Sequence, residues 1–142
     1  MANTNRALQI ELPDGWEDQT VHFFMGPEES GMQHTLTVMV DPAPDTRDLA
    51  EYSERYTPRW VEALPNSELL SDQPQQLEGG SSCWSVVCKS IPAERQILLH
   101  KRWYLLVNKT GFICTASFTK RTIKTIGVDV ERTVAGLAAA AR

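Results

Sequence analysis

The second half of the chain contains three β-rich segments that follow one another with only short turns between them. The segments cover residues 83–91, 95–107 and 112–119, and the turns are Pro92-Ala93-Glu94 and Asn108-Lys109-Thr110-Gly111. Strands joined by so few residues pair antiparallel, because a parallel pair needs a crossover of a dozen residues or more. This feature limits the chain to architectures that are built on an antiparallel sheet.

Further strands are predicted on both sides of a central helix. Residues 7–12, 20–25 and 35–40 are β-rich, whereas 26–31 are predicted as a loop because they hold Gly, Pro, Glu and Ser. After the helix, a broken strand is expected over 68–71 and 75–77, followed by a turn at Gly79-Gly80. The predicted order is three strands, a helix, about four strands and a second helix.

Two segments repeat apolar residues at helical spacing. The first follows the rigid sequence 41–44, DPAP, and we expect Asp45 or Thr46 to cap it. Pro58 lies inside its pattern and is expected to kink the helix, or to restart it with Thr57 as the cap. The second segment begins near Ile126 and continues to the end of the chain.

These elements predict one α+β domain over residues 1–142. Its antiparallel sheet would have about six to seven strands and would pack with the two helices. The chain has 142 residues, of which 42% are hydrophobic and 23% are charged. Those proportions are typical of a globular domain with a single core.

Charge and targeting signals narrow the class of protein. The net charge is −4 and the cations are scattered, which argues against nucleic-acid binding, because phosphates require clustered cations. The first ten residues lack the apolar core of a signal peptide, and no window approaches the roughly 18 apolar residues of a membrane span. We therefore expect a cytoplasmic protein that is not membrane-inserted. Its cysteines, Cys83, Cys88 and Cys114, are expected to be free thiols.

No motif for catalysis, for a metal or for a cofactor is found, and we expect a protein that is not an enzyme. The sequence has no GxSxG, HExxH, GxxxxGK[ST] or GxGxxG pattern. Cys83 and Cys88 are five residues apart on a predicted strand, so their side chains point to opposite faces and do not share a metal easily. The enzymatic hypothesis that remains is a nucleophile pair of Cys114 and His100 on neighbouring strands.

The predicted strands carry apolar residues on both of their faces. In the 35–40 strand, Leu36, Val38 and Val40 share the face that suits a core beneath a helix, and Thr35, Thr37 and Met39 share the other. Val21 and Phe23 likewise share one face of the preceding strand. Three explanations fit this pattern: helices on both faces, a dimer interface, or a groove for an apolar partner. Small hydroxyl residues among apolar ones also occur where transmembrane helices touch.

The segment 12–24, LPDGWEDQTVHFF, places a turn between two strands. The turn carries Pro13, Asp14, Trp16, Asp18 and Thr20, and the apolar strand follows with Val21 and Phe23. We expect Trp16 to anchor the packing of the turn. A strand, a Pro-Asp-x-Trp-x-Asp-x-(Ser/Thr) turn and an apolar strand resemble the DcrB-like proteins of the PsbP-like fold. Within these, the chain looks most like the Eag-type effector-associated chaperones of bacterial type VI secretion.

The resemblance implies a cytoplasmic homodimer that needs no cofactor. It would bind and shield the N-terminal transmembrane segment of a secreted effector and help load it on the spike protein. In such chaperones a concave sheet face grips the apolar helix, and polar side chains hydrogen-bond to it. The expected partner-binding residues, with Met39 added from the same strand face, are Val21, Phe23, Thr35, Thr37, Met39, Tyr56, Leu64 and Lys101.

A second hypothesis assigns the chain to a different functional class. In this hypothesis it is a DcrB-like accessory protein that binds another folded protein and has no enzymatic activity.

Overall fold

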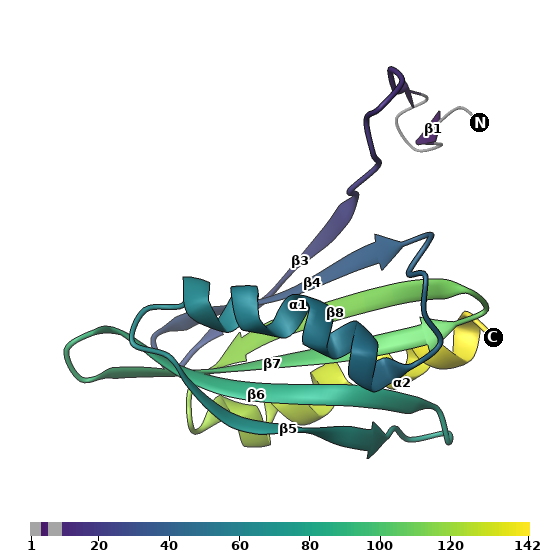
Figure 1. The fold of residues 1–142 in the computed structure, drawn as a ribbon. Coiled ribbons are helices and arrows are strands. Elements are labelled where there is room, and N and C mark those ends of the chain that lie inside the picture. The colour runs from purple at the N-terminus through teal and green to yellow at the C-terminus, as the bar shows by residue number, and fades with distance from the viewer. Residues whose placement is uncertain (1–3, 6–9) are drawn as a thin grey trace.

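A computed structural model describes residues 4–5 and 10–142 of the chain (Figure 1). Six strands form one antiparallel sheet in the order β3-β4-β8-β7-β6-β5. They are β3 (Val21–Glu29), β4 (Met32–Asp41), β5 (Glu68–Gln76), β6 (Ser82–Ala93), β7 (Gln96–Val107) and β8 (Thr110–Phe118). The helices are α1 (Leu49–Ala63) and α2 (Ile126–Ala140), with a short 3-10 turn, η1 (Thr122–Lys124), before α2. This arrangement confirms the predicted α+β class.

Two short strands lie apart from this sheet. β1 (Thr4–Asn5) and β2 (Ile10–Glu11) pair antiparallel, and Figure 1 shows them at the end of a segment that leads away from β3. Part of the strand that was predicted over 7–12 lies outside the described residues, and β2 covers its residues 10–11. The predicted turn after it is confirmed, since the Trp16 backbone N–H donates to the Pro13 carbonyl at 3.2 Å.

The two helices pack on opposite faces of the sheet. α1 lies over β5, β6 and β7, where it buries a cluster of Tyr52, Val86, Tyr104 and Ile113. α2 lies over β7 and β8, and the core on that face includes Trp103, Leu105, Cys114, Phe118 and Val134. Three explanations were open for the two apolar faces of the sheet. At the centre of the sheet, the explanation that helices cover both faces therefore applies. Strand β3, at one edge, is exposed along its whole length.

The predicted loop over 26–31 is wrong, because β3 continues through residues 26–29 and β4 begins at Met32. The two strands meet at a tight turn, Ser30-Gly31, in which both residues have positive φ, 55° and 75°. Pro27 is accommodated by a register shift between Met25 and Glu28. An edge strand tolerates a proline because its outer N–H groups have no ladder partner. The same reason explains Pro74 in β5, the other edge, where the two predicted pieces form one irregular strand.

The start and the interior of α1 also differ from the prediction. Asp48, rather than Asp45 or Thr46, is the N-cap, and its Oδ1 accepts from the backbone N–H of Ala50 at 2.9 Å. The helix runs without interruption through Pro58. No second helix begins there, so the restart with Thr57 as a cap is wrong.

A close approach of α1 to the β7–β8 hairpin explains Gly111. The hairpin turn consists of Asn108 and Lys109, both with positive φ (48° and 62°), and Gly111 belongs to β8. A Cβ atom at position 111 would lie 2.7 Å from Cζ of the buried Tyr52 and even closer to its hydroxyl. Only glycine leaves room for this ring, whose hydroxyl donates a hydrogen bond to Asp41 Oδ2 at 3.0 Å.

Glu131 joins α2 to the sheet. Its Oε1 accepts from Lys101 Nζ (2.8 Å), Gln75 Nε2 (2.8 Å) and Trp103 Nε1 (3.2 Å). Burial by itself raises the pKa of Glu131, but these hydrogen bonds and the Lys101 charge bring that pKa below its ordinary value. The ionised carboxylate therefore stabilises the folded chain.

We expect Glu131→Gln to lower the free energy of unfolding at pH 7 by about 1–3 kcal/mol, because a half-buried Lys101 loses its counter-ion. The folded-state pKa of Glu131 is depressed, so its contribution is present above the ordinary pKa and disappears as the pH falls through the folded-state value. Urea unfolding of both proteins from pH 7 to pH 3 should show the gap closing below about pH 4.5. A gap that is constant over this range would contradict the role of the ionised carboxylate.

Candidate functional site

Most of the predicted partner-binding residues gather on one face of the sheet, beside α1. Val21 lies opposite Met39, and Phe23 lies opposite Thr37, so all four side chains share that face. Val21 and Phe23 are 52% and 59% exposed, and their β4 neighbours are half-buried. We name this region the α1-side surface. It consists of Val21, Phe23, Thr35, Thr37, Met39, Arg102 and Thr115.

One side of α1 borders this surface. Trp60 stacks on Arg102, whose strand β7 is next to β8, and Tyr56 precedes Trp60 by one helical turn. Met39 and Tyr56 pack against the same buried cluster. Leu64 follows one further turn along, as the C-cap residue of the helix. The helix therefore forms a wall, and β4 and β3 form an open floor that ends at the sheet edge.

Lys101 does not lie with the other predicted residues. It points to the opposite face of the sheet, where its ammonium pairs with Glu131 and lies 5.2 Å from the centre of the Trp103 ring. The cation on the α1-side surface is the next residue, Arg102, which the sequence reasoning did not select. Strand alternation carried part of the signal, because it places residue 101 with Trp103 and residue 102 with Tyr104, but the face of each pair follows from the strand register.

Hydroxyl groups accept hydrogen bonds from Arg102, and further hydroxyl groups lie along the α1-side surface. Arg102 Nε donates to Thr115 Oγ1 at 2.9 Å, and Nη1 donates to the Tyr104 hydroxyl at 3.4 Å. The Tyr104 hydroxyl is also within 2.8 Å of Thr57 Oγ1. On the far side, Thr37 Oγ1 donates to the Thr115 carbonyl at 3.4 Å. The surface thus combines apolar side chains with polar groups that are already partly satisfied.

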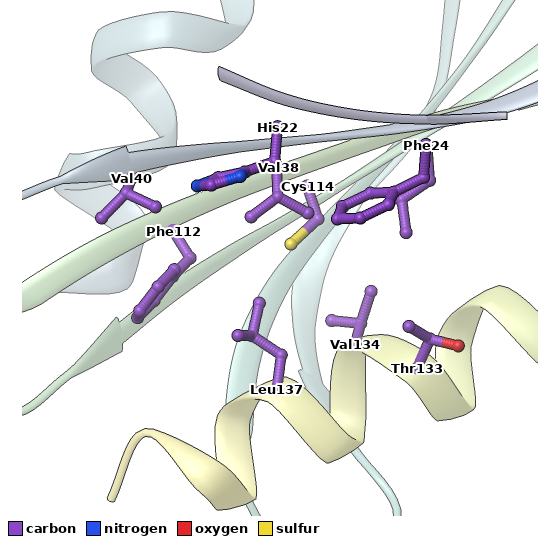
Figure 2. Close-up of a pocket in the computed structure, with 10 residues that line it drawn as sticks. His22, Phe24, Val38, Val40, Phe112, Cys114, Thr133, Val134 and Leu137 are labelled. Carbon is purple, nitrogen blue, oxygen red and sulfur yellow. The ribbon is translucent and has the colours of Figure 1, made fainter. Parts of the chain in front are cut away.

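A separate apolar pocket lies on the other face of the sheet, between β3 and α2 (Figure 2). Its volume is about 580 Å³. Figure 2 shows His22 and Phe24 of β3 on one side and three residues of α2 on the other, with strand residues between them. We name it the α2-side pocket, and its lining residues are His22, Phe24, Leu36, Val38, Val40, Phe112, Cys114, Thr133, Val134 and Leu137.

The residues of the enzymatic hypothesis are not brought together. Cys114 faces α2, where burial raises the pKa of its thiol to about 12, so the nucleophilic thiolate is scarce. His100 points to the α1 side, between Ser90 (2.6 Å) and Ser117 (2.7 Å), and burial lowers its pKa. Cys83 and Cys88 also point to opposite faces. The described part of the chain contains no cluster of three or more metal-ligating side chains.

Trp16, which we expected to anchor the packing of the turn, lies at the surface. Its side chain is 62% exposed, in the segment that joins β2 to β3. Within the described ranges, no helix is both long enough and apolar enough to cross a membrane.

Comparisons with known proteins place the chain in a family. A solved structure of a Pseudomonas aeruginosa protein of unknown function, PA94, has a similar fold, with a TM-score of 0.66 at 16% sequence identity. The similarity covers 94% of this chain and 92% of that one. No curated protein sequence matches the chain. The model of the DcrB family matches residues 8–98, which is more than half of the sequence. The chain therefore belongs to the DcrB family.

Proposed function

We propose that this chain is a cytoplasmic chaperone that binds the N-terminal transmembrane segment of a type VI secretion effector. It shields this segment from water and helps load the effector on the secretion spike. The proposal is more specific than the family assignment, which favours a non-enzymatic accessory protein. It draws on the resemblance to the Eag-type chaperones that the Pro13–Thr20 turn and the following apolar strand suggest.

One observation carries the proposal: the floor of the α1-side surface is apolar, exposed and bounded by a helix. Val21 and Phe23 are each more than half exposed, next to Thr37 and Met39. Large apolar side chains at such exposure in adjacent positions are typical of a binding surface. The threonine hydroxyls add the small polar groups that occur between packed transmembrane helices.

The energetics suit this role. Each Å² of apolar surface that a helix exposes to water costs about 25 cal/mol relative to the buried state. An unshielded transmembrane segment therefore aggregates or inserts at the wrong place. A surface that covers one side of the helix recovers part of this free energy without any chemical step. The separation of Cys114 from His100 is consistent with a function that requires no reaction.

The proposal includes a homodimer, which the two sheet edges support. The edge strand β5 carries Glu68, Asp72 and Pro74, which discourage pairing with another strand. The edge strand β3 carries Pro27, Glu28 and Glu29 near its end, but its first five residues, 21–25, include no acidic residue, lysine, arginine or proline. A second copy can therefore add to the sheet along residues 21–25 of β3. Sedimentation equilibrium should give twice the chain mass of 15.9 kDa, and a monomer at all concentrations would refute this part of the proposal.

The α2-side pocket favours a second candidate function. A half-open apolar pocket of this volume can accept side chains from a folded protein, as an accessory protein of the DcrB family would require. In that case the partner would contact Phe24 rather than Phe23, because the two residues point to opposite faces.

Co-expression separates the two candidates. The N-terminal region of an effector encoded beside this chain is produced with and without it, and the soluble fraction of the effector is measured. We expect the effector to become soluble only with the chaperone, and to lose that dependence when its apolar segment is deleted. An effector that is equally soluble and stable alone would refute the proposed function.

A further inference from the structure

We propose that Arg102 makes the α1-side surface selective for an apolar helix that carries an aspartate or glutamate side chain. This inference rests on the proposed function and names the chemistry of the segment that is bound. Among the described residues, the groups that hold the guanidinium of Arg102 in place are uncharged. Its nitrogens donate to the Thr115 and Tyr104 hydroxyls, and its Cζ lies 4.3 Å from the centre of the Trp60 ring.

The neighbouring cation provides the contrast. Lys101 is also half-buried, on the other face, and its ammonium pairs with Glu131 at 2.8 Å. Among the residues that the structure describes, no carboxylate lies within 4.0 Å of Arg102. Asp72 lies in the same row of the sheet, but Val86 separates it from Arg102, and it accepts a hydrogen bond from Trp84. A half-buried arginine is often paired with an anion, and Arg102 has no such partner among the described residues.

The geometry places Arg102 where a bound helix would reach it. Phe23, Thr37, Thr115 and Arg102 lie directly opposite one another on four adjacent strands, β3, β4, β8 and β7. Strands are about 4.8 Å apart, so this row spans about 14 Å. A helix with its side chains is about 10–12 Å wide. A helix that lies along the strands and rests on Phe23 therefore has its other flank beside Arg102 and Trp60.

The chemistry of the pair explains the selectivity. A guanidinium presents a planar set of donors that matches the two oxygens of a carboxylate, and the contact with the Trp60 ring and the hydrogen bonds to Thr115 and Tyr104 limit its movement. The interaction gains strength once an apolar helix excludes water from the surface. A segment with a neutral residue at this position leaves the cation without a counter-charge, and a segment with a lysine is repelled.

Model helices test the inference without knowledge of the natural partner. The probes are 20-residue Leu/Ala helices fused to a soluble carrier, with Glu, Gln or Lys at the centre. Their binding is measured to the wild-type chain, Arg102→Gln and Arg102→Glu, with Lys101→Gln as the matched control. We expect the wild type and Lys101→Gln to prefer the Glu helix over the Gln helix by at least about 10-fold. Arg102→Gln should lose that preference, and Arg102→Glu should prefer the Lys helix.

The outcomes separate this inference from the proposed function. Equal binding of the Glu and Gln helices by the wild type would overturn the role of Arg102 and leave the binding of apolar helices intact. A preference that survives in Arg102→Gln would also overturn it. Failure of the wild type to bind any of the three helices would overturn both claims.

Discussion

Replacement of Val21 or Phe23 by aspartate is expected to weaken the binding of an apolar segment by about 100-fold or more, while the fold survives. Each change places a carboxylate in the apolar floor, where a bound helix would remove it from water without a partner. Both side chains are more than half exposed on an edge strand, so the melting temperature should shift by only a few degrees. Titration of a labelled apolar helix with each variant measures the loss.

Phe24→Asp is the matched control for this prediction. Phe24 is adjacent to Phe23 and similarly exposed, at 54%, but it lines the α2-side pocket on the opposite face. We expect this variant to bind the segment like the wild type. Weak binding by Phe24→Asp together with normal binding by Phe23→Asp would move the functional site to the pocket.

Gly111→Ala is expected to have the largest effect on stability, a loss of about 3 kcal/mol or more. The added methyl group would overlap the Tyr52 ring, which is fully buried between α1 and the sheet. Insertion of a methyl group into a packed core typically costs about 1–3 kcal/mol, and more where a rigid ring cannot move aside. The free energy of unfolding in urea, compared with that of the wild type, measures this cost.

Gly136→Ala serves as the control for the glycine substitution itself. Gly136 is an exposed residue inside α2, and a Cβ atom there would meet nothing within 4 Å. Alanine favours the helix over glycine by about 0.5–1 kcal/mol, so this variant should be slightly more stable than the wild type. A loss of less than about 1 kcal/mol in Gly111→Ala would show that Tyr52 moves aside without difficulty.

Short turns and strand alternation predicted the fold class. The turns after Pro92 and Asn108 required antiparallel pairing, and the structure confirms it. Alternation also identified which residues share a face, but it does not say which helix covers a face, and so the positions of α1 and α2 stayed open. The 26–31 segment was misjudged because its Gly, Pro and Glu residues suggest a loop, whereas an edge strand tolerates all of them.

Strand alternation also predicted part of the candidate site. Alternation grouped Val21 with Phe23 and Thr35 with Thr37, and the register of β3 and β4 brings these pairs together. Lys101 came instead from a match by position to a family. Strand alternation separates Lys101 from Arg102, and the register of β7, β8 and β4 shows that Arg102 is the residue on this face. Neither approach could reveal that Lys101 has a counter-ion whereas Arg102 has none among the described residues, since that depends on where α2 places Glu131.

The central claim is that the α1-side surface holds an apolar helix, and site-specific photocross-linking tests it most directly. Benzoylphenylalanine replaces Phe23 in one protein and Phe24 in another, and each is irradiated with a 20-residue Leu/Ala helix on a soluble carrier. The account predicts a cross-link to the helix from position 23 and none from position 24. A cross-link from position 24 alone, or equal cross-linking from both positions, would contradict it.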